Sequence, residues 1–256
     1  IIDTGIYSAD PEFAGRISPD STGVAGNTGP EADHSAGANA YHGTQVAMVA
    51  AAANDGQGTV GIAYGATIMM IRSDDPGSCA SPGDCTFGDL ADGINWAVAH
   101  GAVVINMSLG GDGGAAPDEI AAVQNAAAHG VVIVLAAGND GKGKPDEYAQ
   151  SLVGAGGNVI IVGAVDSTGK IASFSNRAGT FSAEYLAALG VNVPIFLDDS
   201  GIYDPTTTTP INGTSFSAPQ VAGAVALLKQ AFPLLTGQQI VQLLLTTAED
   251  VGAPGV

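Results

Sequence analysis

The sequence predicts an α/β fold in three layers, with an open, mostly parallel sheet that carries helices on both faces. Apolar, strand-like runs take turns with helical stretches along the chain, as in parallel sheets covered by helices. Several runs are unbroken, which is typical of strands buried on both faces. The 256 residues, 46% of them hydrophobic, suit one domain over 1–256. The chain begins inside an apparent strand and stops without an obvious closing element, so both ends read as cut.

Each expected element follows from its own pattern of apolar residues. Strands are expected at the apolar runs 1–3, 68–72, 103–109, 131–137 and 159–165. Helices are expected at about 43–53, 87–100 and 118–129. A last helix follows position 212, because Val221, Val225 and Leu228 recur at helical spacing, and Pro219 is expected in its first turn. Segments rich in Gly, Pro, Asp, Ser or Thr, expected to be surface loops, lie at 18–40, 140–158 and 198–210.

Two helix-to-strand units end alike, in AVAHGAVVINMSLG and AAAHGVVIVLAAGN. The glycine after each histidine is typical of a helix C-cap. A histidine in a last turn interacts favourably with the exposed carbonyl groups. We therefore interpret His100 and His129 as structural rather than functional.

Charge and cysteine content narrow the class of protein. Seven basic against 25 acidic residues give a net charge of −18, which argues against nucleic acid or an anionic membrane as a partner. No apolar run reaches the roughly 20 residues that span a bilayer, and no targeting segment opens the chain. Cys79 and Cys85 flank the turn-rich ASPGD, which favours a disulfide and an oxidising, extracellular setting; the alternative is two free thiols in a reducing cytosol.

Three polar residues stand at the ends of expected elements. Asp3 ends the first strand, His42 begins a helix, and Ser215 begins another in NGTSFSAPQVAGAVALL. Each alone has a plainer interpretation, as a turn residue or a cap. Together they are the set that activates a serine nucleophile, because a histidine takes the hydroxyl proton and a carboxylate orients the histidine. Their chain order, Asp then His then Ser, is the order in which these three residues occur in subtilisin.

The segments IIDTGI, HGTQVA, INMSLGG, AAGND and NGTSFSAPQVAG resemble, in order, the signature segments of the subtilisin-like serine proteases. The resemblance implies an endopeptidase that forms an acyl-enzyme, with Asp3 as orienting acid, His42 as general base and Ser215 as nucleophile. Asn139 is then the oxyanion donor, together with the Ser215 backbone N–H. A non-catalytic binding module of the same fold, or an inactive fragment, is the alternative.

The resemblance also implies how a polypeptide substrate binds. Two edges, Ser108, Leu109, Gly110 and Ala136, Ala137, Gly138, would hold an extended peptide through exposed backbone groups. Phe87 aligns with an aromatic that lines an outer pocket, or else is a core residue at a helix start. The segment 140–158 would form the floor of the main pocket, where Asp146 or Glu147 would favour a basic residue. Gln45 replaces a second histidine of the family and Met48 a small residue, and we expect activity to survive both.

Catalysis of this kind needs no cofactor, but a structural calcium ion is expected from the resemblance. Glu12 and Asp55 fall where some relatives bind calcium, and carboxylates are suitable ligands, although acidic loop residues are commonly only solvated. The histidine base predicts activity at neutral to alkaline pH. Other expected partners are a propeptide or a downstream membrane-anchoring segment outside the chain, and the protein is expected to be a monomer.

Overall fold

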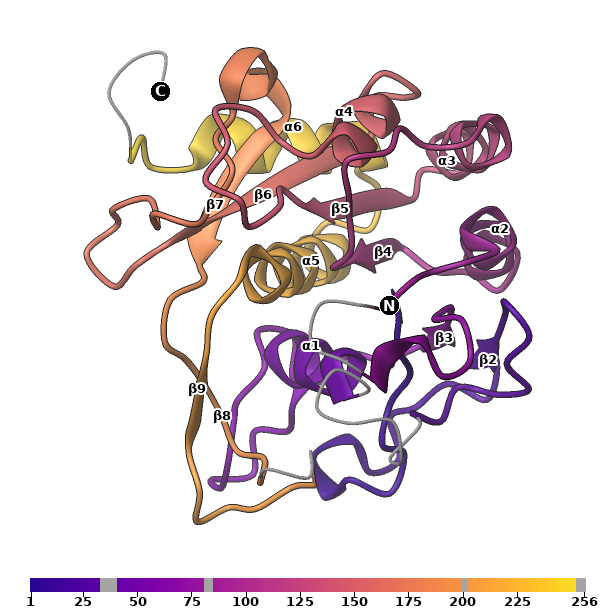
Figure 1. Ribbon diagram of the computed structural model, residues 1–256, viewed down its shortest axis with the longest axis vertical. Helices are drawn as coiled ribbons and strands as arrows, with labels where there is room; N and C mark the ends of the chain where they lie inside the picture. The colour runs from indigo at the N-terminus through magenta and orange to yellow at the C-terminus, as the bar shows by residue number, and fades with distance from the viewer. Residues whose placement is uncertain (33–40, 81–84, 199–201, 252–256) are drawn as a thin grey trace.

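The computed structural model describes residues 1–32, 41–80, 85–198 and 202–251 (Figure 1). Its main sheet has seven parallel strands in the order β2-β3-β1-β4-β5-β6-β7. These are β1 (Ile2–Asp3), β2 (Thr22–Gly23), β3 (Ile71–Arg72), β4 (Val104–Met107), β5 (Val132–Ala136), β6 (Val159–Val165) and β7 (Tyr185–Leu189). A separate antiparallel ribbon pairs β8 (Val193–Ile195) with β9 (Thr209–Ile211).

Helices cover both faces of the sheet (Figure 1). On one face, the apolar sides of α2 (Leu90–Ala99), α3 (Pro117–Ala128) and α4 (Glu147–Val153) pack in one cluster with β4 and β5. On the other face lie α1 (His42–Ala51), α5 (Thr214–Ala231) and α6 (Gly237–Thr247). Residues of β5 and β6 alternate between the two faces and are buried on both, as their unbroken apolar sequences predict. The expected three-layer α/β fold is confirmed.

The expected strands and helices are present, with some shorter than expected. The run at 68–72 forms ladder pairs only over β3, because Ile68 makes an isolated bridge to Ile17. The histidines at both helix ends are caps as expected, since His100 Nδ1 donates to Trp96 O and His129 Nδ1 to Asn125 O, both at 2.8 Å.

The loop expected at 140–158 is wrong, because this segment contains α4. Tyr148, Ala149 and Leu152 of α4 are buried against the sheet, so tertiary packing supports a helix that the local composition disfavours. The helix α6 and the strands β2, β7, β8 and β9 were not expected, and β2 lies within the loop expected at 18–40. Of the other expected loops, 33–40 and 199–201 lie outside the described residues, as does 252–256 of the expected domain.

Two further features bear on the setting of the protein. Cys79 and Cys85 are joined by a disulfide, with Cα atoms 4.3 Å apart, although residues 81–84 between them lie outside the described residues. Among the helices of the described residues, none combines the length and apolar character that a bilayer span requires.

The register of the sheet brings the ends of three strands together. Ile2 pairs with Met107, and Met107 pairs with Leu135. Because parallel strands end at the same edge, Asp3, Ser108 and Ala136 meet at the carboxyl edge of the sheet, where ligands bind in open α/β folds.

Candidate active site

Asp3 and His42 are brought together by the close approach of α1 to the end of β1. His42 is the first residue of α1, and its Nδ1 donates a hydrogen bond to Asp3 Oδ1 at 2.8 Å. The next residue, Gly43, has no side chain to hold the helix away: a Cβ there would lie 2.2 Å from Gly5 O. The lack of a side chain at Gly43 is therefore a condition for the pair.

The surroundings of His42 favour its charged form. Burial lowers the pKa of His42, but the charge of Asp3 and the hydrogen bond to it outweigh burial and raise that pKa above its ordinary value of 6.5. Asp3 is fully buried, whereas the side chain of His42 is 25% exposed. Since Nδ1 faces Asp3, Nε2 is the ring nitrogen left for a proton transfer.

Ser215 lies in the first turn of α5, where a helix has backbone N–H groups without intrahelical partners. Three of these are satisfied: Gly213 N donates to Gly190 O, Thr214 N to Asn139 Oδ1 and Phe216 N to Gly213 O. Among the described residues, the Ser215 N–H has no acceptor. Gly213 enters the helix with φ +148°, a conformation that side chains rarely adopt, so glycine is required there.

The hydroxyl of Ser215 does not hydrogen-bond to His42 in this structure. Ser215 Oγ donates to Ser108 O at 3.2 Å, and within the described residues no hydrogen bond joins it to the imidazole. The two residues are nevertheless neighbours, because the ring of Phe216, next in the chain, lies 5.5 Å from the ring of His42. The structure thus brings Asp3 and His42 into contact and places Ser215 near them, but no hydrogen bond connects Ser215 to His42.

Pro219 lies in the second turn of α5, not in the first as expected from the sequence, because the helix already begins at Thr214. A residue at this position would normally donate its N–H to the carbonyl of Ser215, four residues earlier, and proline has none. Ser108 Oγ supplies the missing donor, at 2.8 Å from Ser215 O, and itself accepts from Asn106 Nδ2 at 2.9 Å. The backbone of Ser215 is therefore tied to the end of β4.

Asn139 is held so that its amide nitrogen is free. Its Oδ1 accepts from both the N–H and the hydroxyl of Thr214, at 2.9 and 3.0 Å. Nδ2 consequently points the other way, 3.8 Å from the position that a Cβ of Gly213 would occupy, and the residue is exposed. Asn139 Nδ2 and the Ser215 N–H are thus two donors at the start of α5 that have no partner among the described residues.

The two expected substrate edges differ in their free backbone groups. The N–H and C=O groups of Leu109 and Gly110 make no hydrogen bond within the described residues, and Gly110 is exposed. By contrast, Ala137 and Gly138 are paired on both sides, because Ala137 O accepts from Asp146 N and Gly138 O from Asn176 N, both at 3.0 Å. Unpaired backbone groups are therefore found at Leu109 and Gly110, whereas Ser108 O is bonded to Ser215 Oγ and the backbone groups of Ala137 and Gly138 are paired.

Comparison with known proteins agrees with this geometry. The sequence matches the profile of the Subtilase family over residues 1–256. The chain belongs to the subtilase family. It is 34% identical over 258 residues to subtilisin DY of Bacillus licheniformis, a match that covers 98% of this chain and 83% of the relative. It is 33% identical over 271 residues to fervidolysin of Fervidobacterium pennivorans, covering 100% of this chain but only 38% of that protein.

Solved structures give the same result. A cold-adapted subtilisin-like serine proteinase superposes with a TM-score of 0.76 at 29% identity, covering 99% of this chain and 83% of the other. The structure of fervidolysin, described as a keratinolytic enzyme related to subtilisin, gives a TM-score of 0.78 at 33% identity, covering 99% and 39%. This subtilase is accordingly a serine endopeptidase, a hydrolase.

The remaining predicted residues of this subtilase lie away from Ser215. Phe87 is half-buried, bridges to Asp74 and packs on the core beside α2. Within the described residues, no hydrogen bond or ring contact joins it to the edge at 108–110. Glu12 is 1% exposed in a short helical turn, and Asp55 is exposed in a loop. In α1, Met48 is fully buried, so the apolar core accommodates a side chain larger than the small residue expected at this position from the family.

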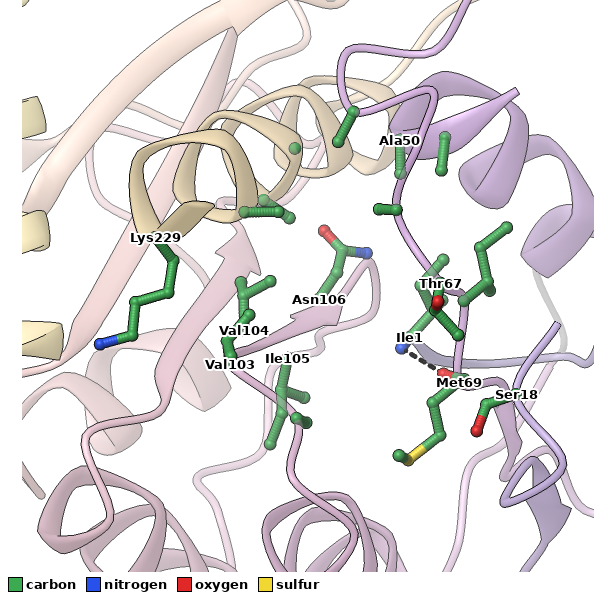
Figure 2. A pocket seen from close by; sticks show the side chains of 18 of the residues that line it. Ile1, Ser18, Ala50, Thr67, Met69, Val103, Val104, Ile105, Asn106 and Lys229 are labelled. Atoms are coloured by element: carbon green, nitrogen blue, oxygen red, sulfur yellow. Dashed lines mark hydrogen bonds between the residues drawn. The ribbon is translucent and has the colours of Figure 1, made fainter. Parts of the chain in front are cut away.

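A cavity of about 740 Å³ lies at the opposite end of the strands from Asp3 (Figure 2). It is lined by Val103, by Val104 to Asn106 of β4, by Ile1 and Met69, and by Lys229 of α5. These residues mark the amino ends of the strands, whereas Asp3, Ser108 and Ala137 mark the carboxyl ends. The cavity is therefore separate from the active site of the subtilase.

Sequence reasoning missed two residues that position this site, Thr214 and Asn176, and missed the roles of Ser108 and Pro219. Thr214 fixes Asn139, Ser108 acts through its side chain as well as its backbone, and Pro219 frees the carbonyl of Ser215. Asn176, in SFSNRAG, donates to Ala137 O and to Asp146 Oδ1. A threonine directly before the nucleophile was a visible signal, but the partners of the other three depend on how distant segments meet.

Proposed function

We propose that this subtilase hydrolyses polypeptides with Asp3, His42 and Ser215 as its catalytic triad. His42 Nε2 takes the proton of Ser215 Oγ as the oxygen attacks the scissile carbonyl, and Asp3 stabilises the imidazolium that forms. His42 then gives the proton to the leaving amine, and water hydrolyses the acyl-enzyme. The observation that carries the proposal is the 2.8 Å contact of His42 with Asp3 beside the start of α5.

The negative oxygen of the tetrahedral intermediate would be received by Asn139 Nδ2 and the Ser215 N–H. Both donors are free of other partners among the described residues, and the dipole of α5 adds positive potential at its start. In known subtilisins, removal of such an asparagine donor costs about 2.7–4 kcal/mol. The extended substrate would pair with Leu109 and Gly110, while 136–138 would form the wall of the main pocket.

The first step requires a rotation of the Ser215 side chain. Its hydroxyl has to leave Ser108 O and turn to His42, and hydrogen bonds of this kind commonly tighten only when substrate binds. The unclosed triad is also the one observation that favours the alternative, a non-catalytic module in which Ser215 stays bonded to Ser108.

A fluorophosphonate probe separates the two. We expect it to label Ser215 in the folded protein, with the modified residue identified by mass spectrometry. Ser215→Ala should abolish labelling, and Ser217→Ala, which changes the buried serine two positions along the same helix, should retain it. A folded wild-type protein that fails to label would refute the proposed triad.

The setting of the protein follows from its covalent and charge properties. The disulfide between Cys79 and Cys85 and the net charge of −18 support an extracellular or surface-exposed subtilase. We propose that residues 1–256 act as one monomeric peptidase domain without a catalytic cofactor. The predicted partner outside this chain, a propeptide or a downstream membrane-anchoring segment, is to be sought in the full gene.

We also propose a structural calcium ion at Glu12 and Asp55. Glu12 Oε2 accepts from Ala53 N at 2.9 Å, and Oε1 is buried. Burial raises the pKa of this carboxyl and outweighs the Tyr203 hydroxyl and the charge of Arg16, which both act to lower it. Asp55 lies close enough for its charge to contribute, after burial, to a raised pKa of Glu12. Two carboxylates so close together, one of them buried, suit a hard cation that prefers oxygen ligands. The ion would neutralise charge and tie the loop at Asp55 to the turn at Glu12.

A further inference from the structure

The carboxylate of Asp146 lies between the two segments that would hold the substrate. A Cβ on Gly110 would lie 2.9 Å from Asp146 Oδ2, and a Cβ on Gly138 would lie 2.4 Å from Oδ1. The backbone of the same segment is tied to both sides, since Asp146 N donates to Ala137 O and Tyr148 N to Gly111 O. Asp146 therefore occupies a fixed place between the edge and the wall of the proposed site.

One oxygen of this carboxylate has no donor. Asn176 Nδ2 donates to Oδ1 at 2.7 Å, which orients the group, whereas Oδ2 has no hydrogen-bond partner within the described residues. The residue is only 7% exposed. The small exposed part of Asp146 includes Oδ2, because this oxygen is not among the fully buried polar atoms that lack a partner. A cation can therefore reach Oδ2 directly and pair with the charge.

Other acidic groups around Asp146 make the surroundings of its carboxylate more favourable for a cation. Burial and the charges of Asp140 and Asp112 raise the pKa of Asp146, against the lowering effects of Lys142 and the Asn176 hydrogen bond. Carboxylate oxygens of the three acids all lie within 4.8 Å of one another. Lys142 is the cation that faces them, but its Nζ pairs with Asp112 and Asp140. Two charges of the cluster thus share one ammonium group, and the buried one is left for another cation.

Gly138 connects this carboxylate to the reacting centre. Its N–H contacts Thr214 Oγ1 at 3.3 Å, and its neighbour Asn139 is the proposed oxyanion donor. A substrate whose carbonyl faces Asn139 would direct the side chain on the amino side of the cleaved bond between Gly110 and Gly138. Lysine and arginine are the residues long enough to bring a cation to a carboxylate at the base of such a pocket.

We propose that Asp146 determines specificity, selecting lysine or arginine on the amino side of the cleaved bond. This inference rests on the proposed function, because it assumes that 108–110 and 136–138 hold the substrate. Asp146 is favoured over Glu147, since Glu147 is exposed at the start of α4, while the carboxylate of Asp146 occupies the space that a side chain at Gly110 or Gly138 would need.

The test compares chromogenic peptides that differ only in the residue before the cleaved bond: lysine, arginine, citrulline, leucine and phenylalanine. We expect the wild type to prefer lysine and arginine over neutral citrulline. Asp146→Asn keeps the oxygen that accepts from Asn176 but removes the charge. It should lower kcat/KM for the lysine and arginine peptides by at least about 30-fold, and leave the leucine and phenylalanine peptides within about 3-fold. Asp20→Asn, with the same charge change at the far edge of the sheet, should alter none of them.

Fluorophosphonate labelling of Ser215 is measured in parallel to separate the two proposals. If the wild type labels but Asp146→Asn cleaves lysine and arginine peptides as well as the wild type, the inference is wrong and the proposed function stands. If the wild type fails to label, the proposed function itself is wrong. Should Asp146→Asn fail to fold, Lys142→Met decides, because removal of the competing cation should raise kcat/KM for lysine and arginine peptides only. An unchanged or lower value would overturn the inference.

Discussion

At the scale of single residues, the position of Ser215, the proposed nucleophile, depends on a proline that cannot donate a hydrogen bond. Pro219 leaves the carbonyl of Ser215 without its helical donor, and Ser108 Oγ fills that place at 2.8 Å. Ser108→Ala should therefore leave a carbonyl unsatisfied beside the catalytic hydroxyl. We expect kcat/KM to fall about 10-fold with the fold retained, as measured by peptide hydrolysis and circular dichroism.

The control for that change is Ser18→Ala, which removes another buried serine hydroxyl, one that accepts from Asp20 N far from the site. It should cost similar stability and no activity. Equal activity losses in both variants would mean that Ser108 acts only through general stability, and that the tie to Ser215 has no catalytic role.

The pH dependence of activity is also set by single residues, His42 and Asp3. His42 has to be neutral to accept a proton, and Asp3 raises its pKa above 6.5, so kcat/KM should rise with pH through a midpoint above 6.5. Asp3→Asn removes the charge that raises the pKa, so the midpoint should move to lower pH while activity falls by about 10⁴-fold, as in the known serine protease case. A pH–rate profile of both proteins measures this. Hydrolysis that peaks near pH 4 and vanishes at pH 8 would contradict His42 as the base.

At the scale of elements, the approach of α1 to β1 is what holds the acid and the base together. A methyl group on Gly43 would lie 2.2 Å from Gly5 O and 3.1 Å from Gly5 N, and these backbone atoms cannot move aside as a side chain could. Gly43→Ala should push α1 outward, cost about 1–3 kcal/mol in the free energy of unfolding, and lengthen the contact between His42 and Asp3. Activity should fall more than stability alone explains, which urea unfolding and kcat/KM together would show.

Gly93→Ala is the matched control within another helix. Its added methyl would lie 3.3 Å from the side chain of Ile71, which can shift, and not against backbone. We expect a small change in unfolding free energy and unchanged activity. If Gly43→Ala behaved in the same way, close helix-to-strand contact would not be a condition for the catalytic pair.

The elements also show what the sequence can and cannot predict. Strand β6 is predictable to the residue, because an unbroken apolar run of this length is buried on both faces only inside a sheet that helices cover on both sides. The short α4 is not, since its stability comes from burying Tyr148 and Leu152 rather than from local propensity. For α6 a local signal existed, because Thr236 and Gln239 form a capping box. Contacts such as Ser108 with Ser215 join residues 107 positions apart, so no local pattern encodes them.

At the scale of the whole molecule, buried acids near the first strand make stability depend on pH and on cations. Burial raises the pKa of Asp10 from 3.8 to about 6, and burial also raises the pKa of Glu12. Because the unfolded chain ionises these groups at lower pH than the folded protein, stability without metal should fall as pH rises from about 4 through 6. A cation beside Glu12 would offset that loss, since it favours the ionised form that high pH produces.

Calcium should therefore stabilise the protein more at pH 8 than at pH 5. At a concentration 100 times its dissociation constant, an ion that binds only the folded state adds about 2.7 kcal/mol, so Tm should rise on adding calcium and fall on adding EDTA at pH 8. Glu12→Gln should abolish the response, whereas Glu119→Gln should retain it, because Glu119 likewise accepts a backbone N–H but lies at the start of α3. Differential scanning calorimetry of the three proteins at both pH values measures these shifts. If calcium raised the Tm of all three proteins equally, the ion would bind at another place. If calcium did not change the Tm of the wild type, the proposed calcium site at Glu12 would be wrong.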